Sequence, residues 1–334
     1  MNKERFTRRS FLKLLAVSTA VAGLASCSDT GTSVTATGAT RTMVDVEGTT
    51  VEVPDKPQRI VTLSEPTLDA VLALGHTPVG TVAGRGQQTV PSYLMDRAAD
   101  IPLLGSVSQL NFEAIGAVQP DLILVDGTSV NNNPPIVEAL REIAPTVYTG
   151  YAGGDWRKNL GFVSQALNEE GEGEKVVEKY EKRAEEMKKQ LTAYHNDTFA
   201  IVRWQGNAPS LILKELPAGR ALEDIGLKRP PSQDRLGRGH SWPVSAENIA
   251  EIDADYMFFG TLGGSSVTNP EAGGDADRAA AEDALRVAIQ VPGFTDLTAY
   301  QKNHIIPVDG AAWTSTGGPL LMNRILDDVE TNLL

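Results

Sequence analysis

The chain has 334 residues and carries 43 acidic against 30 basic side chains, a formal net charge of −13. This length allows one large domain or two ordinary ones, and so acidic a chain lacks the basic surface that nucleic-acid binding requires. The single cysteine excludes an internal disulfide and any site built from several cysteines, and the only long apolar run, which begins near residue 11, excludes a multi-pass membrane protein.

The first 26 residues have the features of an export signal. Five basic residues within Met1–Lys13 precede an apolar run, Leu14–Ala25, that is too short to span a membrane comfortably. The basic part, Thr7-Arg8-Arg9-Ser10-Phe11-Leu12-Lys13, resembles a twin-arginine signal. The run closes with Leu24-Ala25-Ser26-Cys27, which resembles a lipobox, so we expect cleavage before Cys27 and lipidation of its thiol.

Residues 27–42 are rich in Ser, Thr, Gly and Ala and predict a flexible tether after the lipidated cysteine. The leader holds five basic residues and one acid, so the processed chain is more acidic still. These features predict an acidic globule that is lipid-anchored on the extracytoplasmic face of the cell membrane.

Residues 43–154 alternate β-branched runs with helical patterns, which predicts an N-terminal α/β lobe with a mostly parallel sheet. A proline at position 66 and a glycine at 75 mark the two ends of the first helix. The expected strands are 59–63, 79–82, 122–125 and 146–148, and the expected helices begin near 66, 112 and 135.

Residues 155–191 keep helical spacing throughout, with Gly171 and Gly173 as the expected point of division. Their outer face alternates Glu and Lys, as solvated helix faces do. The α/β rhythm returns in 192–334, with strands expected at 199–202, 256–259 and 305–308 and a closing helix at 318–329. The sequence therefore predicts a C-terminal lobe joined to the first by a long helical bridge.

An internal repeat relates the two lobes. Asn111–Val125 and Ser245–Phe259 align without a gap and match at Glu113/Glu247, Ile115/Ile249 and Asp121/Asp255. Each segment is typical of a capped helix, a tight turn and a buried strand. We therefore expect two Rossmann-like lobes with a ligand cleft between them.

Four phrases in order over about 280 residues resemble the iron–siderophore substrate-binding proteins of ABC importers, whose members bind ferric siderophores, ferric citrate or vitamin B12. The phrases are RIVTLSEPTLDAVLALGHTPVG, NFEAIGAVQPDLIL, SWPVSAENIAEIDADYMFF and VDGAAWTSTGGPLLMNRILDDV. The resemblance implies two α/β lobes bridged by a helix, little movement on binding, no catalysis, and delivery of a ferric siderophore to an ABC permease dimer with its ATPase. It leaves the siderophore class open.

The chain carries no GxSxG, GxxxxGK[ST], HExxH or strand-linked GxGxxG motif. Its four histidines form no convergent metal-ligand pattern, so we expect the protein to bind no metal directly and the iron to arrive chelated. Two alternatives remain open: a haem or corrinoid cargo, and a secreted hydrolase using Ser64 and Glu65. For Ser64 no partner base is evident, and a serine between strand and helix is more often an N-cap.

Anionic chelates call for arginines and aromatic walls. Residues 203–240 hold seven basic and four acidic residues in an otherwise acidic chain. Arg203 is expected to close its strand, and Arg220, Arg235 and Arg238 follow in the same stretch. The resemblance adds Arg85, after an N-terminal strand, and the aromatics Trp242 and Trp313. The predicted ligand-binding residues are Arg85, Arg203, Arg238, Trp242 and Trp313.

Glu113 and Glu247 occupy equivalent first-turn positions in the two repeats. A carboxylate there is stabilised by the helix dipole. The resemblance implies a second role, because relatives use this pair of glutamates to dock onto arginines of the permease dimer.

Overall fold

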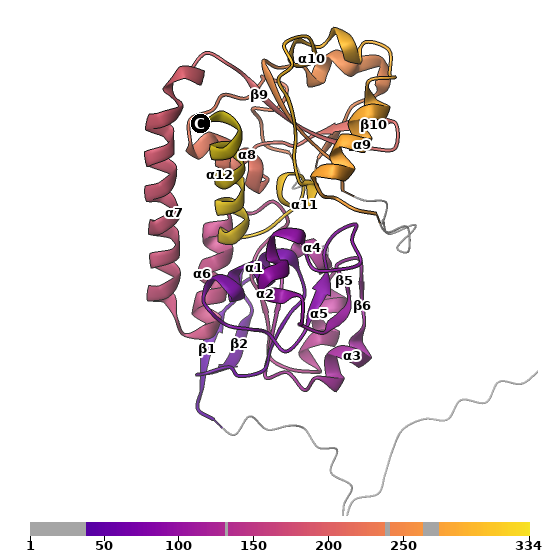
Figure 1. Cartoon of the computed structure of the whole chain (residues 1–334). Coiled ribbons are helices and arrows are strands. Elements are labelled where there is room, and N and C mark those ends of the chain that lie inside the picture. Colours follow the sequence, from indigo (N-terminus) through magenta and orange to yellow (C-terminus); the bar gives the residue numbers. More distant parts are fainter. Residues whose placement is uncertain (1–37, 131–132, 238–240, 263–273) are drawn as a thin grey trace, which may run out of the picture. The chain divides into compact units, whose positions relative to one another are not determined.

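A computed structural model describes residues 38–130, 133–237, 241–262 and 274–334. The leader, Cys27 and Arg238 lie outside the described residues. In Figure 1 the described chain runs from the hairpin of β1 (Thr40–Val44) and β2 (Thr50–Pro54) to helix α12 (Pro319–Leu333). Strand β1 begins at Thr40, so the last three residues predicted to be tether belong to this hairpin.

The N-terminal lobe is built on parallel strands. β3 (Ile60–Thr62), β7 (Leu122–Val125) and β8 (Thr146–Tyr148) form one sheet, and β4 (Thr81–Ala83), β5 (Leu103–Ser106) and β6 (Gln109–Leu110) form another. A parallel bridge between Val61 and Gly80 links the two. Within these two described sheets, β6 runs antiparallel to β5 and the other pairings are parallel. The short apolar strands are buried almost throughout, as expected of a sheet covered on both faces.

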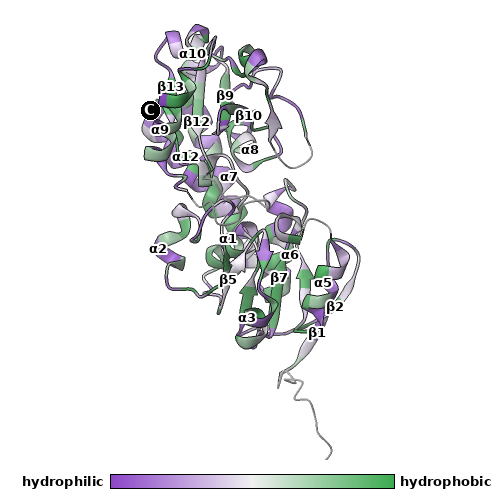
Figure 2. Ribbon diagram, turned by 90° about the vertical axis from the view of Figure 1, so that its right-hand side faces the viewer, coloured by the Kyte–Doolittle hydropathy of each residue, from purple (hydrophilic) through white to green (hydrophobic). Residues whose placement is uncertain are grey.

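Helices surround these strands. The helical elements of this lobe are α1 (Glu65–Ala73), η1 (Ser92–Leu94), α2 (Met95–Ala98), α3 (Phe112–Ala117), α4 (Gly127–Val130) and α5 (Pro134–Arg141). Figure 2 shows the strands in hydrophobic colours and the hydrophilic residues gathered on outer helix faces and loops.

The C-terminal lobe has a five-stranded sheet in the order β11-β10-β9-β12-β13. The strands are β9 (Phe199–Gln205), β10 (Ala208–Leu211), β11 (Trp242–Pro243), β12 (Tyr256–Gly260) and β13 (Ile305–Pro307). The parallel core of β9, β12 and β13 was predicted, whereas the antiparallel edge of β10 and β11 was not. The remaining helical elements are η2 (Leu191–Tyr194), α8 (Pro217–Asp224), η3 (Ala246–Ile252), α9 (Arg278–Ala288), η4 (Phe294–Asp296), α10 (Thr298–Gln301), α11 (Gly310–Trp313) and α12.

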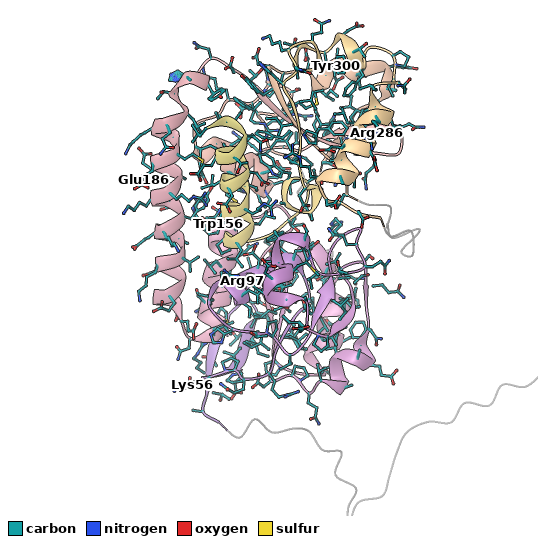
Figure 3. The ribbon with its side chains drawn as sticks, viewed as in Figure 1. Lys56, Arg97, Trp156, Glu186, Arg286 and Tyr300 are labelled. Carbon is teal, nitrogen blue, oxygen red and sulfur yellow. The ribbon has the colours of Figure 1, made fainter. Side chains whose placement is uncertain are left out.

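Two helices form the predicted bridge, α6 (Trp156–Leu167) and α7 (Glu170–Gln190). Asn168, in the left-handed conformation at φ 62°, ends α6, so the division falls before Gly171 and Gly173 and not at them. Trp156 is buried and meets Tyr180 edge-on at 5.1 Å between ring centroids, which holds the two helices together (Figure 3).

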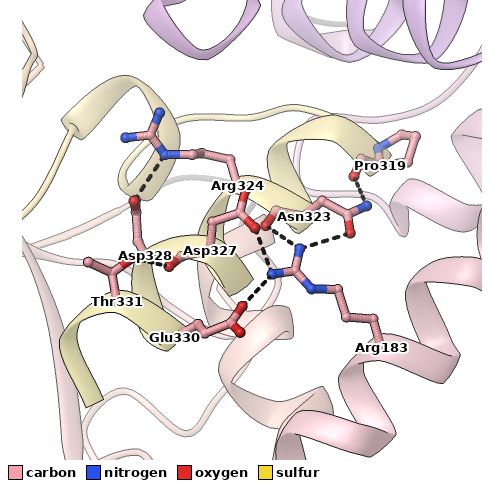
Figure 4. Close-up of polar contacts among 8 residues, drawn as sticks. All are labelled: Arg183, Pro319, Asn323, Arg324, Asp327, Asp328, Glu330 and Thr331. Atoms are coloured by element: carbon pink, nitrogen blue, oxygen red, sulfur yellow. Dashed lines mark hydrogen bonds and ion pairs between the residues drawn. The ribbon is translucent and has the colours of Figure 1, made fainter. Parts of the chain in front are cut away.

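Polar contacts join α7 to α12. The Arg183 guanidinium donates to the Asn323 carbonyl at 3.2 Å and pairs with Asp327 at 2.6 Å and Glu330 at 3.0 Å (Figure 4). Because α7 follows α6 and α12 closes the chain, this cluster connects the bridge to the C-terminal lobe. In the described part of the chain, no helix is both long and apolar enough to cross a membrane.

Candidate functional site

Arg85 lies in the loop after β4, partly buried, and its guanidinium is held by a backbone carbonyl. Its backbone N–H donates to Glu65 Oε1 at 2.7 Å, and its Nη2 donates to the carbonyl of Thr128 at 3.1 Å. Thr128 is fixed in turn by Asp126, whose Oδ1 accepts the Thr128 N–H at 3.0 Å. Two acids therefore hold the Arg85 loop through backbone groups, and among the described residues neither forms an ion pair with the Arg85 guanidinium.

Arg203 belongs to strand β9, which continues past the predicted end at Val202 to Gln205. Its Nη2 donates to Ser241 Oγ, its Nη1 donates to the carbonyl of Thr314 at 3.5 Å, and its Nε is buried without a partner among the described residues. Burial, and secondly the positive charge of Arg85, lower the pKa of the Arg203 guanidinium to about 10. The predicted arginines thus approach one another from the two lobes.

Arg157, by contrast, is paired with carboxylates. Its guanidinium pairs with Glu181 at 2.8 Å and with Asp224 at 3.2 Å, as a structural arginine does. Arg85 and Arg203 form no such pair within the described residues, and the Arg203 guanidinium, with a pKa of about 10, stays protonated at neutral pH. Two cations held by carbonyl and hydroxyl oxygens form a site that favours an anion.

The two tryptophans predicted to line the cleft differ in their burial. Trp313 is fully buried, stacks on Phe258 at 4.0 Å and donates its indole N–H to Asp328 at 2.8 Å. It is a core residue, and the expectation that it lines the cleft is wrong. Trp242 is 48% exposed on the edge strand β11, with the Arg235 guanidinium over its ring at 4.3 Å.

Arg220 is not among the predicted ligand-binding residues, and its side chain reaches the other lobe. Its Nη2 donates to the carbonyl of Gly153 at 3.2 Å, and its Nε donates to the carbonyl of Glu215 at 2.8 Å. A narrow crevice lies beside this contact and is lined by residues from both lobes. Among its lining residues are Asp126, Thr128, Tyr151, Pro217 and Thr316.

Sequence reasoning missed the two acids that anchor Arg85. Glu65 and Asp126 are buried, and burial raises the pKa of the Asp126 carboxyl to about 6. The signal that could have found this anchor is Asp126-Gly127-Thr128, which follows the predicted strand 122–125 directly. At Gly127 a Cβ atom would lie 2.8 Å from the Ala152 nitrogen, so the turn requires glycine.

Ser64 is a helix cap. Its hydroxyl accepts the Thr67 N–H at 3.3 Å, and its side chain is 1% exposed. This placement gives a substrate no access to the hydroxyl. The part of the chain that the structure describes contains no group of three or more His, Cys, Asp or Glu side chains able to hold a metal ion.

Glu113 and Glu247 are exposed in the first turns of α3 and η3. Neither forms an ion pair with another described residue. A separate cavity of about 1210 Å³ opens beside β5 and β6, with a mixed polar and apolar lining that includes Asp275 and Asp277 of the C-terminal lobe. The polar lining residues include Gln87, Thr89, Ser92, Gln109 and Asn111.

Comparisons with known proteins agree with the resemblance drawn from the sequence. The periplasmic binding protein family matches residues 60–312. The chain is 30% identical over 300 residues to the probable siderophore-binding lipoprotein YfiY of Bacillus subtilis, covering 88% of each chain. It is 26% identical over 288 residues to the achromobactin-binding periplasmic protein of Dickeya dadantii, covering 82% of this chain and 85% of that relative.

The fold is shared with a solved structure. Staphylococcus aureus SirA complexed with staphyloferrin B aligns with a TM-score of 0.70 at 23% identity, covering 87% of this chain and 97% of SirA. The α/β class predicted from the sequence is confirmed by this likeness and by the family match, which covers most of the chain. The chain belongs to the periplasmic binding protein family.

Proposed function

We propose that this protein captures a ferric siderophore between Arg85 and Arg203 and delivers it to an ABC importer without catalysis. The observation that carries the proposal is the pair of cations that have no carboxylate partner among the described residues. Relatives named as siderophore-binding and achromobactin-binding proteins support the same cargo. In this proposal iron enters as the finished chelate, and an anionic chelate fits the charge of the site.

A fluorescence titration of the chain from Ser28 onward tests this function. The probes are ferric citrate, ferrichrome and ferric enterobactin, which represent carboxylate, hydroxamate and catecholate chelates. We expect Arg85→Ala and Arg203→Ala each to weaken binding of the preferred chelate about ten- to a hundredfold, because hydrogen bonds to charged groups contribute roughly 1.5–3 kcal/mol.

Arg97→Ala is the matched control, since Arg97 is exposed on α2 (Figure 3) and forms no ion pair with another described residue. Its affinity should equal that of the wild type. Wild-type affinity in both Arg85→Ala and Arg203→Ala would place the chelate elsewhere and remove the basis of the proposal.

Attachment to the membrane completes the proposal. Cys27 at the end of the lipobox would carry the lipid, and the twin-arginine leader would direct export of the chain. Two relatives that are named lipoproteins support the extracytoplasmic, membrane-anchored location. Loss of fatty-acid labelling in Cys27→Ala cells tests the anchor, and labelling that persists would exclude it.

A further inference from the structure

The loop after β8 brings an aromatic side chain to the arginine site. Tyr151 lies three residues beyond the carboxyl end of β8, at the sheet edge where loops of α/β folds contact ligands. Its side chain is 45% exposed, although its ring lies 5.9 Å from the fully buried ring of Tyr148. One neighbour therefore supports the ring while almost half of its surface stays open.

The backbone joins this loop to the Arg85 anchor. The Gly127 N–H donates to the Gly150 carbonyl at 2.9 Å, and a Cβ atom on Gly127 would lie 3.3 Å from the Tyr151 Cα. The turn and the loop are therefore in direct contact. The next residue of that turn, Thr128, supplies the carbonyl that accepts Arg85 Nη2 at 3.1 Å.

The other lobe reaches the same place. Tyr151 lines the crevice together with Thr128 and Thr316, whose hydroxyls lie 3.4 Å apart across the lobes. Thr316 follows two residues after Thr314, whose carbonyl accepts Arg203 Nη1 at 3.5 Å. Tyr151 therefore lies next to the residues that anchor both arginines.

We propose that Tyr151 forms the aromatic wall of the chelate site, the role for which Trp313 is too deeply buried; this inference rests on the proposed function. A tyrosine offers a wide apolar face and one hydroxyl, which suits a chelate with a carbon skeleton and an oxygen-rich edge. The two arginines supply the charge and the ring supplies the surface on which the ligand lies.

Equilibrium dialysis of the purified full-length chain against the three probes, each labelled with radioactive iron, tests this role. Tyr151→Ala should weaken binding of the preferred probe about tenfold or more. Tyr151→Phe keeps the ring and should retain most of the affinity. A loss in Tyr151→Phe equal to that in Tyr151→Ala would contradict the role of the ring as a wall. Tyr300→Ala, which removes a 38% exposed ring from α10 (Figure 3), is the control and should bind as the wild type does.

The binding results distinguish a failure of this inference from a failure of the proposed function. Wild-type affinity in Tyr151→Ala, with losses in Arg85→Ala and Arg203→Ala, overturns the inference and leaves the function standing. Failure of the wild type to bind any of the three probes overturns both. Thermal unfolding of each variant shows whether a loss of binding reflects misfolding. In that event Tyr151→Leu, which keeps apolar bulk but removes the ring, decides the role of the ring.

Discussion

At the scale of single residues, the candidate site holds its two arginines in place without pairing their guanidinium groups with carboxylates of described residues. Glu65 holds Arg85 through its backbone N–H, and Asp126 holds it through the Thr128 turn. A carboxylate paired with the guanidinium would compete with the ligand for it. Anchoring through carbonyl oxygens fixes the side chain and leaves most of its hydrogen-bonding capacity for an anion.

Asp126 gives this arrangement a measurable pH dependence. Burial, opposed by hydrogen bonds from Thr128 and Ser64, raises the pKa of its carboxyl from 3.8 to about 6. A carboxyl with a raised pKa in the folded state contributes stability that is fully present below the unfolded pKa and is lost as pH rises through about 6. We expect Asp126→Asn to lose this contribution, so that its unfolding free energy relative to wild type rises by on the order of 3 kcal/mol from pH 4 to pH 7.5.

Urea unfolding at several pH values measures that difference. Asp96→Asn is the control, because it removes a carboxyl that is exposed on α2, unlike the buried Asp126. A constant difference between wild type and Asp126→Asn across the range would show that Asp126 stays ionised in the folded protein.

At the scale of elements, one carboxylate caps a helix that begins 250 residues later. Asp69 on α1 accepts the N–H groups of Leu320 at 2.8 Å and Leu321 at 2.9 Å, in the first turn of α12. The glycine before that helix provides no side-chain cap. Asp69 therefore satisfies orphan donors that the local sequence leaves open.

We expect Asp69→Ala to lower the unfolding free energy by about 1–3 kcal/mol, because two buried N–H groups lose their acceptors. Asp69→Asn keeps one acceptor oxygen and should lose less. Denaturant midpoints of the two variants at pH 7.5 check this order. A larger loss in the asparagine variant would contradict the capping role.

Elements with strong local patterns could be predicted from the sequence. Strands β7 and β8 lie where the apolar runs predicted them, and the internal repeat is visible in the structure. Asp121 accepts the N–H groups of Gln58 and Arg59 before β3, and its repeat partner Asp255 accepts the N–H of Thr198 before β9. One carboxylate in each repeat therefore fixes the start of the neighbouring parallel strand.

The structural features that could not be predicted depend on contacts between residues distant in sequence. Nothing near Trp313 shows that its ring meets Phe258, and nothing near Val202 shows that β9 extends to pair with β10. The η3 segment adopts 3-10 turns where its repeat partner α3 is an α-helix. Tertiary packing decides these features, so local periodicity could not supply them.

At the scale of the whole molecule, the segment between β13 and α12 contacts both lobes. Ser92 Oγ donates to Asp309, Ser315 Oγ lies 3.5 Å from Glu65 Oε1, and the Thr128 and Thr316 hydroxyls lie 3.4 Å apart. With the Asp69 cap, these contacts fasten the lobes along one continuous stretch. We expect these polar contacts to restrict movement on ligand binding, as the family resemblance implies.

We propose that the permease docks onto glutamates whose spacing these contacts hold nearly fixed. Glu113 and Glu247 are exposed at equivalent helix starts of the two lobes, so they can meet equivalent basic groups on a two-fold permease dimer. We expect Glu113→Ala/Glu247→Ala to reduce uptake of radiolabelled ferric chelate by intact cells to about a tenth or less, with each single variant between. A desolvated interface pair that loses one partner costs about 2–5 kcal/mol, which is enough for this loss. Affinity for the chelate should stay unchanged, because neither glutamate contacts the arginine anchors.

Glu138→Ala/Glu186→Ala removes the same charge from exposed positions on α5 and α7 and should leave uptake normal. Normal uptake in the Glu113/Glu247 double variant would exclude docking through these glutamates, and an equal loss in the control would reduce the effect to net charge.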